Sequence, residues 1–334
     1  MNVPQAGRQL ARVGLDGFLL ALAGVIGLAY GWPSAGIRQG PLSLEAVAGH
    51  GVSLVFFFYG LRLSPAKLRE GLHNWRLHAV VQAATFVAFP LVVLTGRMLF
   101  AGEEPGWWWL GVFYLAVLPS TVSSSVVRVS IAGGNLPAAF FNAGVSSLLG
   151  VLITPLWMSW LIPTDLGGFD AWGVVGQLTR QVVAPVAVGI LLHPRLGALA
   201  EHHRRRIRFF DQSVILLIVY TSFCQSFARD VFRGFRVSDL LLLGTSLLGL
   251  FFLMFGLIHL VSRRLGFNRE DRITALFCGS KKSLVHGTVM AKVLFAGTAA
   301  TGLVLLPLMV YHALQLVAAS AVAGVMARRA GVAT

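Results

Sequence analysis

The sequence has little charge and lacks the short motifs that are typical of soluble enzymes. Asp, Glu, Lys and Arg make up 12% of its 334 residues, whereas soluble domains carry about 25%. Zinc-ligand, phosphate-loop and dinucleotide-binding motifs are missing from it, as are H-E-x-x-H and G-x-S-x-G. The two cysteines, Cys224 and Cys278, lie in apolar runs, where packing is expected rather than a disulfide or a metal site. These absences argue against an enzyme and against a bound cofactor.

Apolar residues, by contrast, are abundant. They account for 56% of the chain, and the mean hydropathy is +0.75. A helix needs about 20 apolar residues to cross a lipid bilayer, and the long apolar runs fit that length. We therefore predict an all-α, polytopic membrane protein. The ten expected membrane spans lie near 14–32, 43–61, 77–99, 106–131, 137–163, 173–193, 209–228, 238–262, 273–295 and 300–326.

Acidic residues are scarce relative to basic ones, with 13 Asp and Glu against 27 Lys and Arg. The basic residues gather in alternate loops, notably within 62–76, 195–208 and 263–272. Cytoplasmic loops are enriched in Lys and Arg. This bias predicts a multi-pass protein of the cell (inner) membrane with both termini in the cytoplasm. The same bias explains the net charge of +14, so no nucleic-acid partner is expected.

The ten spans divide into two sets of five, at residues 1–167 and 168–334. Because five is odd, the second set enters the membrane from the opposite side, which predicts two inverted repeats. In each set the fourth span is interrupted by polar residues, at Leu118–Ser125 and at Gly279–Ser283. Corresponding interruptions in inverted halves are typical of transporter binding sites. The reason is that backbone freed within a membrane must line a cavity or be buried in protein.

The interruption in the first half has several hydroxyls close to Pro119, which removes one helix hydrogen bond. We expect these hydroxyls and the freed carbonyls to coordinate a cation or a substrate oxygen. The alternative is a kink whose polar groups satisfy one another. Polar side chains of neighbouring spans could face the same cavity or could hold helix pairs together. The candidates are Ser123, Ser124 and Ser125, with Gln82, Thr85 and Asn142 from the neighbouring spans.

The interruption in the second half contains two adjacent lysines, Lys281 and Lys282. A charge at bilayer depth costs several kcal/mol unless it is paired or faces water. Neighbouring residues are about 100° apart on a helix, so both lysines can face one groove only if the helix is broken between them. We expect a lysine here to provide a fixed positive charge for an anionic substrate or to exchange a proton. Alternatively, both lysines lie nearer the membrane interface.

Three more residues of this interruption are candidates. His286 is expected to be a packing residue or a proton relay. Ser280 and Ser283 could in principle pair with a lysine as nucleophile and base. Side chains adjacent in sequence point apart on a helix, however, so we expect these serines to bind substrate or an ion rather than to catalyse a reaction.

Five segments together make the sequence resemble the bile acid:sodium symporter (BASS/SBF) superfamily, and within it the SBF-like branch of sodium-dependent transporters. The resemblance covers essentially the whole chain. The segments are F-F-F-Y-G-L-R-L-S-P (Phe56–Pro65), L-P-S-T-V-S-S-S-V (Leu118–Val126), A-G-G-N (Ala132–Asn135), F-N-A-G-V-S-S-L-L-G (Phe141–Gly150) and G-S-K-K-S-L (Gly279–Leu284). Each is weak alone, but their order and spacing are specific.

The resemblance implies ten helices in two inverted five-helix repeats, arranged as a panel domain and a core domain. It implies that spans four and nine are unwound and cross near the middle of the membrane. The sodium-binding residues of span four in the bile-acid branch match Ser124 and Ser125. The matching residue in span five is Asn142 or Ala143, and the glutamine of span three matches Gln82 or Thr85.

The chain departs from the bile-acid branch in span nine. Phe277 and Lys281 stand where that branch has a sodium-binding acidic residue and a glutamine. A lysine would repel a cation at ~4 Å by about 4 kcal/mol at an effective dielectric constant of ~20. This departure argues against two intact sodium sites and against a bile acid as substrate. A lysine ammonium could take the place of sodium and give a sodium-independent or proton-coupled carrier.

The sequence as a whole favours a secondary active transporter that carries a small organic anion by alternating access. Coupling to sodium or to a proton is expected, and a lysine at the interruption of span nine acts as the countercharge. The alternative is a membrane regulator that keeps the transporter fold without transporting.

Overall fold

The computed structural model describes residues 17–38, 40, 43–64, 74–100, 107–121, 123–161, 171–295, 298 and 300–329. This part of the chain forms helices and no strand, which confirms the all-α prediction for it. The helices are α2 (Gly17–Gly31), α3 (Pro33–Gly36), α4 (Leu44–Arg62), α6 (Trp75–Ala83), η1 (Ala84–Ala88), α7 (Phe89–Phe100), α8 (Trp107–Val117), α9 (Ser123–Ala132), α10 (Leu136–Leu161), α11 (Ala171–Leu178), η3 (Thr179–Val183), α12 (Ala184–His202), α13 (Arg204–Ala228), α14 (Val237–Arg264), α15 (Arg269–Gly279), α16 (Leu284–Leu294) and α17 (Ala300–Arg329).

Seven helical segments of the described chain are long and apolar enough to cross a membrane. Two of them contain a π-helical turn, η1 between α6 and α7 and η3 between α11 and α12. Three of the ten predicted spans are absent from this set. The span near 14–32 corresponds to α2, which has 15 described residues. The spans near 106–131 and 273–295 are each divided into two short helices, α8 with α9 and α15 with α16.

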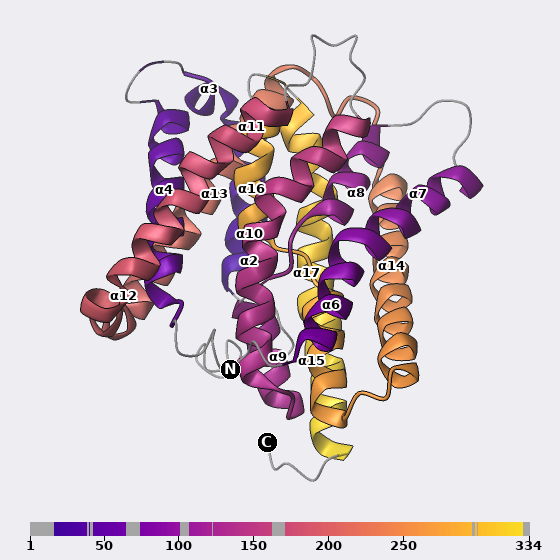
Figure 1. Cartoon of the computed structure of the whole chain (residues 1–334). Coiled ribbons are helices and arrows are strands. Elements are labelled where there is room, and N and C mark those ends of the chain that lie inside the picture. The colour runs from indigo at the N-terminus through magenta and orange to yellow at the C-terminus, as the bar shows by residue number, and fades with distance from the viewer. Residues whose placement is uncertain are drawn as a thin grey trace, which may run out of the picture.

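The helices pack side by side in two groups (Figure 1). In one group α12 and α13 pack along α4, and α13 also packs along α2. In the other, α17 contacts α8, α9, α14 and α16, while α15 contacts α6, α9, α10 and α14. The groups meet where α13 lies against α16 and α17. The divided helices α8–α9 and α15–α16 both belong to the second group.

Three asparagines hold the beginnings of three helices together around one carboxylate. Asn74, Asn135 and Asn268 each accept a hydrogen bond from a backbone N–H in the first turn of α6, α10 and α15. Asn74 and Asn135 also donate their side-chain amides to the buried carboxylate of Asp271. An asparagine cap stabilises a helix start by about 1 kcal/mol. This cluster therefore fixes where the helices that carry the candidate site begin.

Helices α4 and α12 approach each other closely through two glycines. A Cβ atom at Gly60 would lie 2.3 Å from the Val186 carbonyl oxygen, and one at Gly189 would lie 2.3 Å from the Phe57 carbonyl oxygen. Both neighbours are backbone atoms, which cannot rotate away. Small residues allow such close contact between helices in membranes.

We expect Gly189→Ala to force α4 and α12 apart and to destabilise the protein by about 1–3 kcal/mol, the usual cost of overpacking. The measurement is the melting temperature of the purified protein in detergent. Gly244→Ala on α14 is the matched control, because no atom lies within 4 Å of a Cβ placed there. Equal melting temperatures for the two variants would contradict the close contact.

Candidate functional site

The site is formed by two interrupted helices that contact each other directly. Helix α8 ends at Val117 and α9 begins at Ser123, while α15 ends at Gly279 and α16 begins at Leu284. The Ser283 backbone N–H of the second interruption donates to the Pro119 carbonyl oxygen of the first, at 3.0 Å. The polar segments that the sequence places in the two halves are therefore neighbours in the fold.

The ammonium group of Lys282 is held by three backbone carbonyl oxygens. It donates to Ala116 O at 2.6 Å, Thr85 O at 2.8 Å and Leu118 O at 2.9 Å. An ammonium group has three N–H donors, so each has an acceptor. The face of the Phe89 ring lies 4.2 Å from the nitrogen, which adds a cation–π contact. The side chain is 0% exposed, so these oxygens replace water around a buried charge.

Two of these oxygens belong to the end of α8. The last carbonyls of a helix have no partner within it and carry its partial negative charge. Thr154 Oγ1 donates to the Val117 carbonyl at 2.8 Å, between the two carbonyls that Lys282 binds. Together with the bond from Ser283 to Pro119 O, this gives every carbonyl from 116 to 119 a donor. Without these donors the end of α8 would leave several orphan carbonyls inside the protein.

The third oxygen, Thr85 O, is available because of a π-helical turn and a proline. In an α-helix it would accept from the Phe89 N–H, but that N–H bonds to Ala84 O instead. The next residue, Pro90, has no N–H to offer. The carbonyl of Thr85 thus loses its helical partner, and Lys282 replaces it.

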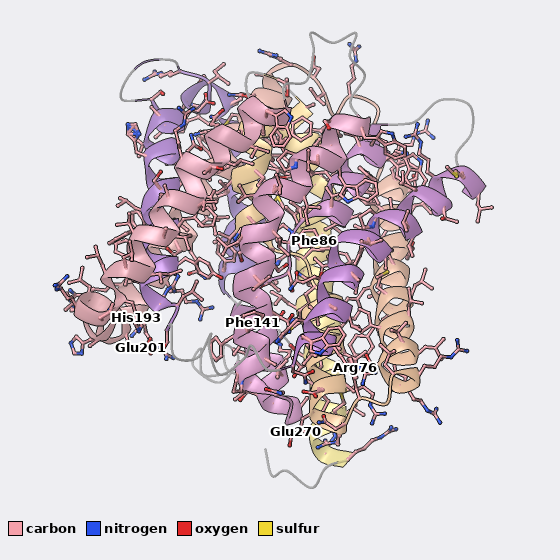
Figure 2. All side chains as sticks on the ribbon, in the orientation of Figure 1. Arg76, Phe86, Phe141, His193, Glu201 and Glu270 are labelled. Atoms are coloured by element: carbon pink, nitrogen blue, oxygen red, sulfur yellow. The ribbon has the colours of Figure 1, made fainter. Side chains whose placement is uncertain are left out.

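Pro90 also deprives the Phe86 carbonyl of a partner, and the indole Nε1 of Trp157 donates to it at 2.9 Å. Figure 2 places Phe86 about midway along the bundle, whereas Arg76 and Glu270 lie near its lower end. Thr85, whose carbonyl is part of the oxygen cage around Lys282, directly precedes Phe86 in the sequence. The cage is therefore near the middle of the bundle.

The side chain of Lys281 contacts the first residues of α9. Its ammonium group donates to Ser124 O at 2.8 Å and to Ser124 Oγ at 3.3 Å, and its side chain is 0% exposed. Arg128, one turn further along α9, and His312 of α17 are close enough to interact electrostatically with it. Arg128 also donates to Ser320 Oγ at 2.7 Å. In the described chain, neither Lys281 nor Lys282 forms an ion pair with Asp or Glu.

Serines of the first interruption donate hydrogen bonds to the end of α15. Ser125 Oγ donates to Phe277 O at 3.0 Å, and Ser120 Oγ donates to Cys278 O. Hydroxyls of one interruption therefore bind the last carbonyls of the helix on the other side. In the opposite direction, Lys282 binds carbonyls at the end of α8, while Lys281 binds Ser124 at the start of α9.

Helix α17 supports the segment between α15 and α16. Gln315 accepts from the Lys282 backbone N–H at 2.9 Å and donates to the Lys282 carbonyl at 2.8 Å. Tyr311 donates its hydroxyl to Ser280 O at 2.7 Å, and Ser280 Oγ bonds back to Leu276 O. Ser280 and Lys282 are thus held by α17 through their main chain.

The other predicted residues occupy the borders of this centre. Gln82 donates to Asn142 O at 3.1 Å and to Asn142 Oδ1 at 3.3 Å. The Gln82 Oε1 atom is buried and has no partner among the described residues. Thr85 uses its hydroxyl within its own helix, on Val81 O. The side chain of Ser123 lies outside the described residues.

His286 faces the first helix group. Its Nδ1 lies 2.9 Å from Ser283 Oγ, and its ring packs edge-on against Phe56 and Tyr59 of α4. Tyr59 OH lies 3.3 Å from Ser147 Oγ of α10. The Nε2 atom of His286 is buried and has no partner within the described structure. A polar atom of this kind is available to a ligand.

Sequence reasoning placed Thr85, Lys281 and Lys282 at the site but did not separate their roles. The contribution of Thr85 is its carbonyl, and the signal for it was Pro90, five residues later. Ser120 was not selected and Gln315 of span ten was only a weaker candidate, although both supply direct contacts to the interruption of span nine. The pattern that points to both is a polar residue within an apolar run, where that run packs against an interruption.

Comparison with known proteins gives a consistent result. The model of the SBF-like CPA transporter family matches residues 16–328. An uncharacterised protein of Pseudomonas aeruginosa is 40% identical over 316 residues, which cover 94% of this chain and 93% of the relative. YfeH of Escherichia coli, named as a candidate symporter, is 36% identical over 324 residues, with 94% and 92% covered. Sodium/bile acid cotransporter 7 of Rattus norvegicus is 30% identical over 319 residues, with 94% and 93% covered.

We expect Lys282→Met to destabilise the protein by on the order of 3 kcal/mol, because it leaves three buried carbonyls without a donor. For a chain of 334 residues the loss corresponds to a fall of roughly 4 °C in melting temperature. Lys281→Met is the matched control. It removes donors from a single residue at the start of a helix, and we expect half of that effect or less. A larger loss for Lys281→Met would contradict the oxygen cage.

Proposed function

Because the chain belongs to the SBF-like CPA transporter family, we propose that it is a secondary active transporter of a small organic anion. It works by alternating access and is driven by a sodium or proton gradient. The observation that carries this proposal is the pair of buried ammonium groups at the junction of the two interruptions, neither of them paired with a carboxylate in the described chain.

Lys281 is the countercharge for the substrate. The described structure gives its ammonium group acceptors on Ser124 alone, and an ammonium group has three donors. Arg128 and His312 lie nearby, and Arg128 adds a second positive charge. An anion bound here would meet opposite charge in a site that is largely shielded from water, where electrostatic attraction is strong. His286, with its available Nε2 atom, borders the same centre.

Lys282 is a structural cation rather than a ligand. All three of its N–H donors are engaged by main-chain oxygens. Ser124, a residue that the family resemblance assigns to sodium, is engaged by Lys281. Ammonium groups therefore occupy oxygen atoms that a sodium ion would need, and this favours a proton over sodium as the coupling ion.

In the membrane, the protein has ten spans in two inverted repeats, at 1–167 and 168–334. Two of these spans are unwound, one formed by α8 with α9 and the other by α15 with α16. The group around α4, α12 and α13 acts as the panel domain, and the group around α15 and α17 acts as the core domain. Both termini are cytoplasmic. Rocking of one group against the other exposes the centre to alternate sides of the inner membrane.

The test is uptake into proteoliposomes of a panel of radiolabelled small carboxylates, under a sodium gradient, a proton gradient or neither. We expect gradient-driven uptake of at least one carboxylate. Lys281→Gln is expected to reduce that uptake at least about tenfold, which corresponds to about 1.4 kcal/mol of lost interaction. Lys281→Arg keeps the charge and is expected to retain more flux.

Each variant is reconstituted only after its melting temperature and its elution profile match those of the unsubstituted chain. Lack of gradient-driven uptake for the whole panel would overturn the proposal and would favour a non-transporting regulator. Full uptake by Lys281→Gln would remove Lys281 from the binding role while leaving transport itself in place.

A further inference from the structure

A polar cavity lies on the seam between the two helix groups, and the paired lysines do not line it. It is partly open to solvent and is lined by residues of α4, α13, α16 and α17. Helix α4 begins here and α16 ends here. Lys292 lies eight residues after Leu284, the start of α16, which is roughly 12 Å along the helix axis. Helix α16 thus connects the central interruption to this cavity.

A contact between α16 and α4 lies at this cavity. The Lys292 ammonium donates to the backbone carbonyl of Glu45. Gly49, one turn further along α4, lies beside the Lys292 nitrogen: a Cβ atom there would be in ordinary van der Waals contact with it, at 3.5 Å. Gln225 of α13 donates to the Glu45 carboxylate at 3.3 Å. Glu45 is thus the point where Lys292 of one group and Gln225 of the other converge.

Lys292 has donor capacity to spare in this position. An ammonium group has three N–H donors, and the described structure gives Lys292 one acceptor, a main-chain oxygen. Unlike Lys282, Lys292 is partly exposed and lines a cavity. A ligand carboxylate is a stronger acceptor for an ammonium group than a neutral carbonyl. The Lys292–Glu45 contact is therefore one that an entering carboxylate can replace.

We propose that this cavity is the outer vestibule of the transport path and that Lys292 is an anion-binding residue within it. The contact between Lys292 and Glu45 closes the seam, and the carboxylate of the substrate binds Lys292 when the seam opens. This inference rests on the proposed transport of an organic anion. The predicted topology places the cavity on the non-cytoplasmic side, because α4 ends at Arg62 and α13 begins at Arg204, at the opposite end.

The test uses a cysteine at Ser222, a buried residue that lines the cavity. Ser222→Cys is reacted with an anionic and a cationic membrane-impermeant methanethiosulfonate reagent, applied separately from each side of oriented vesicles. Both rates are divided by those of a free thiol in solution. The two natural cysteines are buried, so the unsubstituted chain measures the background. Ser213→Cys, at an exposed position on the same helix, is the matched control.

We expect Ser222→Cys to react from the non-cytoplasmic side and to prefer the anionic reagent. Adding Lys292→Gln should lower the ratio of anionic to cationic rates at least about threefold. Lys292→Arg should preserve the ratio, and Ser213→Cys should show no effect of Lys292. Adding Glu45→Gln should raise the ratio of anionic to cationic rates, because it removes a negative charge near Lys292 and keeps the backbone carbonyl that Lys292 binds.

A ratio that Lys292→Gln leaves unchanged, or reaction from the cytoplasmic side alone, would overturn the inference. Uptake by the unsubstituted chain is measured on the same preparation. Uptake without the charge preference would reject the vestibule and keep the proposed function. The charge preference without uptake would show an anion-attracting cavity in a protein that does not transport the panel, and would reject the role of Lys292 in transport.

Discussion

Backbone carbonyls that lose their helical partners inside a membrane protein must find other donors, and this requirement shapes the whole centre of the molecule. The ends of α8 and α15 and the π-helical turn η1 all release such carbonyls near mid-bundle. Lipid cannot hydrogen-bond them. One ammonium group, that of Lys282, satisfies three of them from two different elements. A residue that would be costly anywhere else in the bilayer is here the group that allows two helices to be interrupted at the same place.

The two interruptions hold each other through hydrogen bonds, and the two lysines differ in how many of these bonds they make. Serines next to α9 bind the last carbonyls of α15, while the lysines that follow α15 bind the last carbonyls of α8 and the start of α9. Lys282 is saturated with main-chain acceptors and lies beneath Phe89. Among the described residues, the Lys281 ammonium donates to Ser124 alone, and it lies close to Arg128. Under the proposed function, Lys282 stays fixed in its cage while Lys281 is the group available to an anion.

The sequence predicts more of this arrangement than of its details. Apolar runs and basic loops indicate an all-α membrane protein, and hydroxyls, glycine and lysine within two of those runs locate the candidate site. The length of the runs alone does not indicate where α8 and α15 end, whereas the polar residues within those runs do. The division of labour between Lys281 and Lys282 depends on which carbonyls are orphaned, and for Thr85 that depends on a π-helical turn followed by Pro90. Local residue patterns do not specify such a register shift. The carbonyls that bind Lys282 can therefore be identified only from the fold.

The central claim is that the Lys282 ammonium acts as a tethered cation in a cage of carbonyl oxygens. The most direct measurement is the melting temperature of Lys282→Met in sodium chloride compared with choline chloride at equal ionic strength, alongside the unsubstituted chain. An empty cage of carbonyls can bind sodium, and binding to the folded state alone raises the melting temperature by mass action. We predict that sodium stabilises Lys282→Met more than it stabilises the unsubstituted chain. An identical response of both proteins to the two salts would contradict the claim.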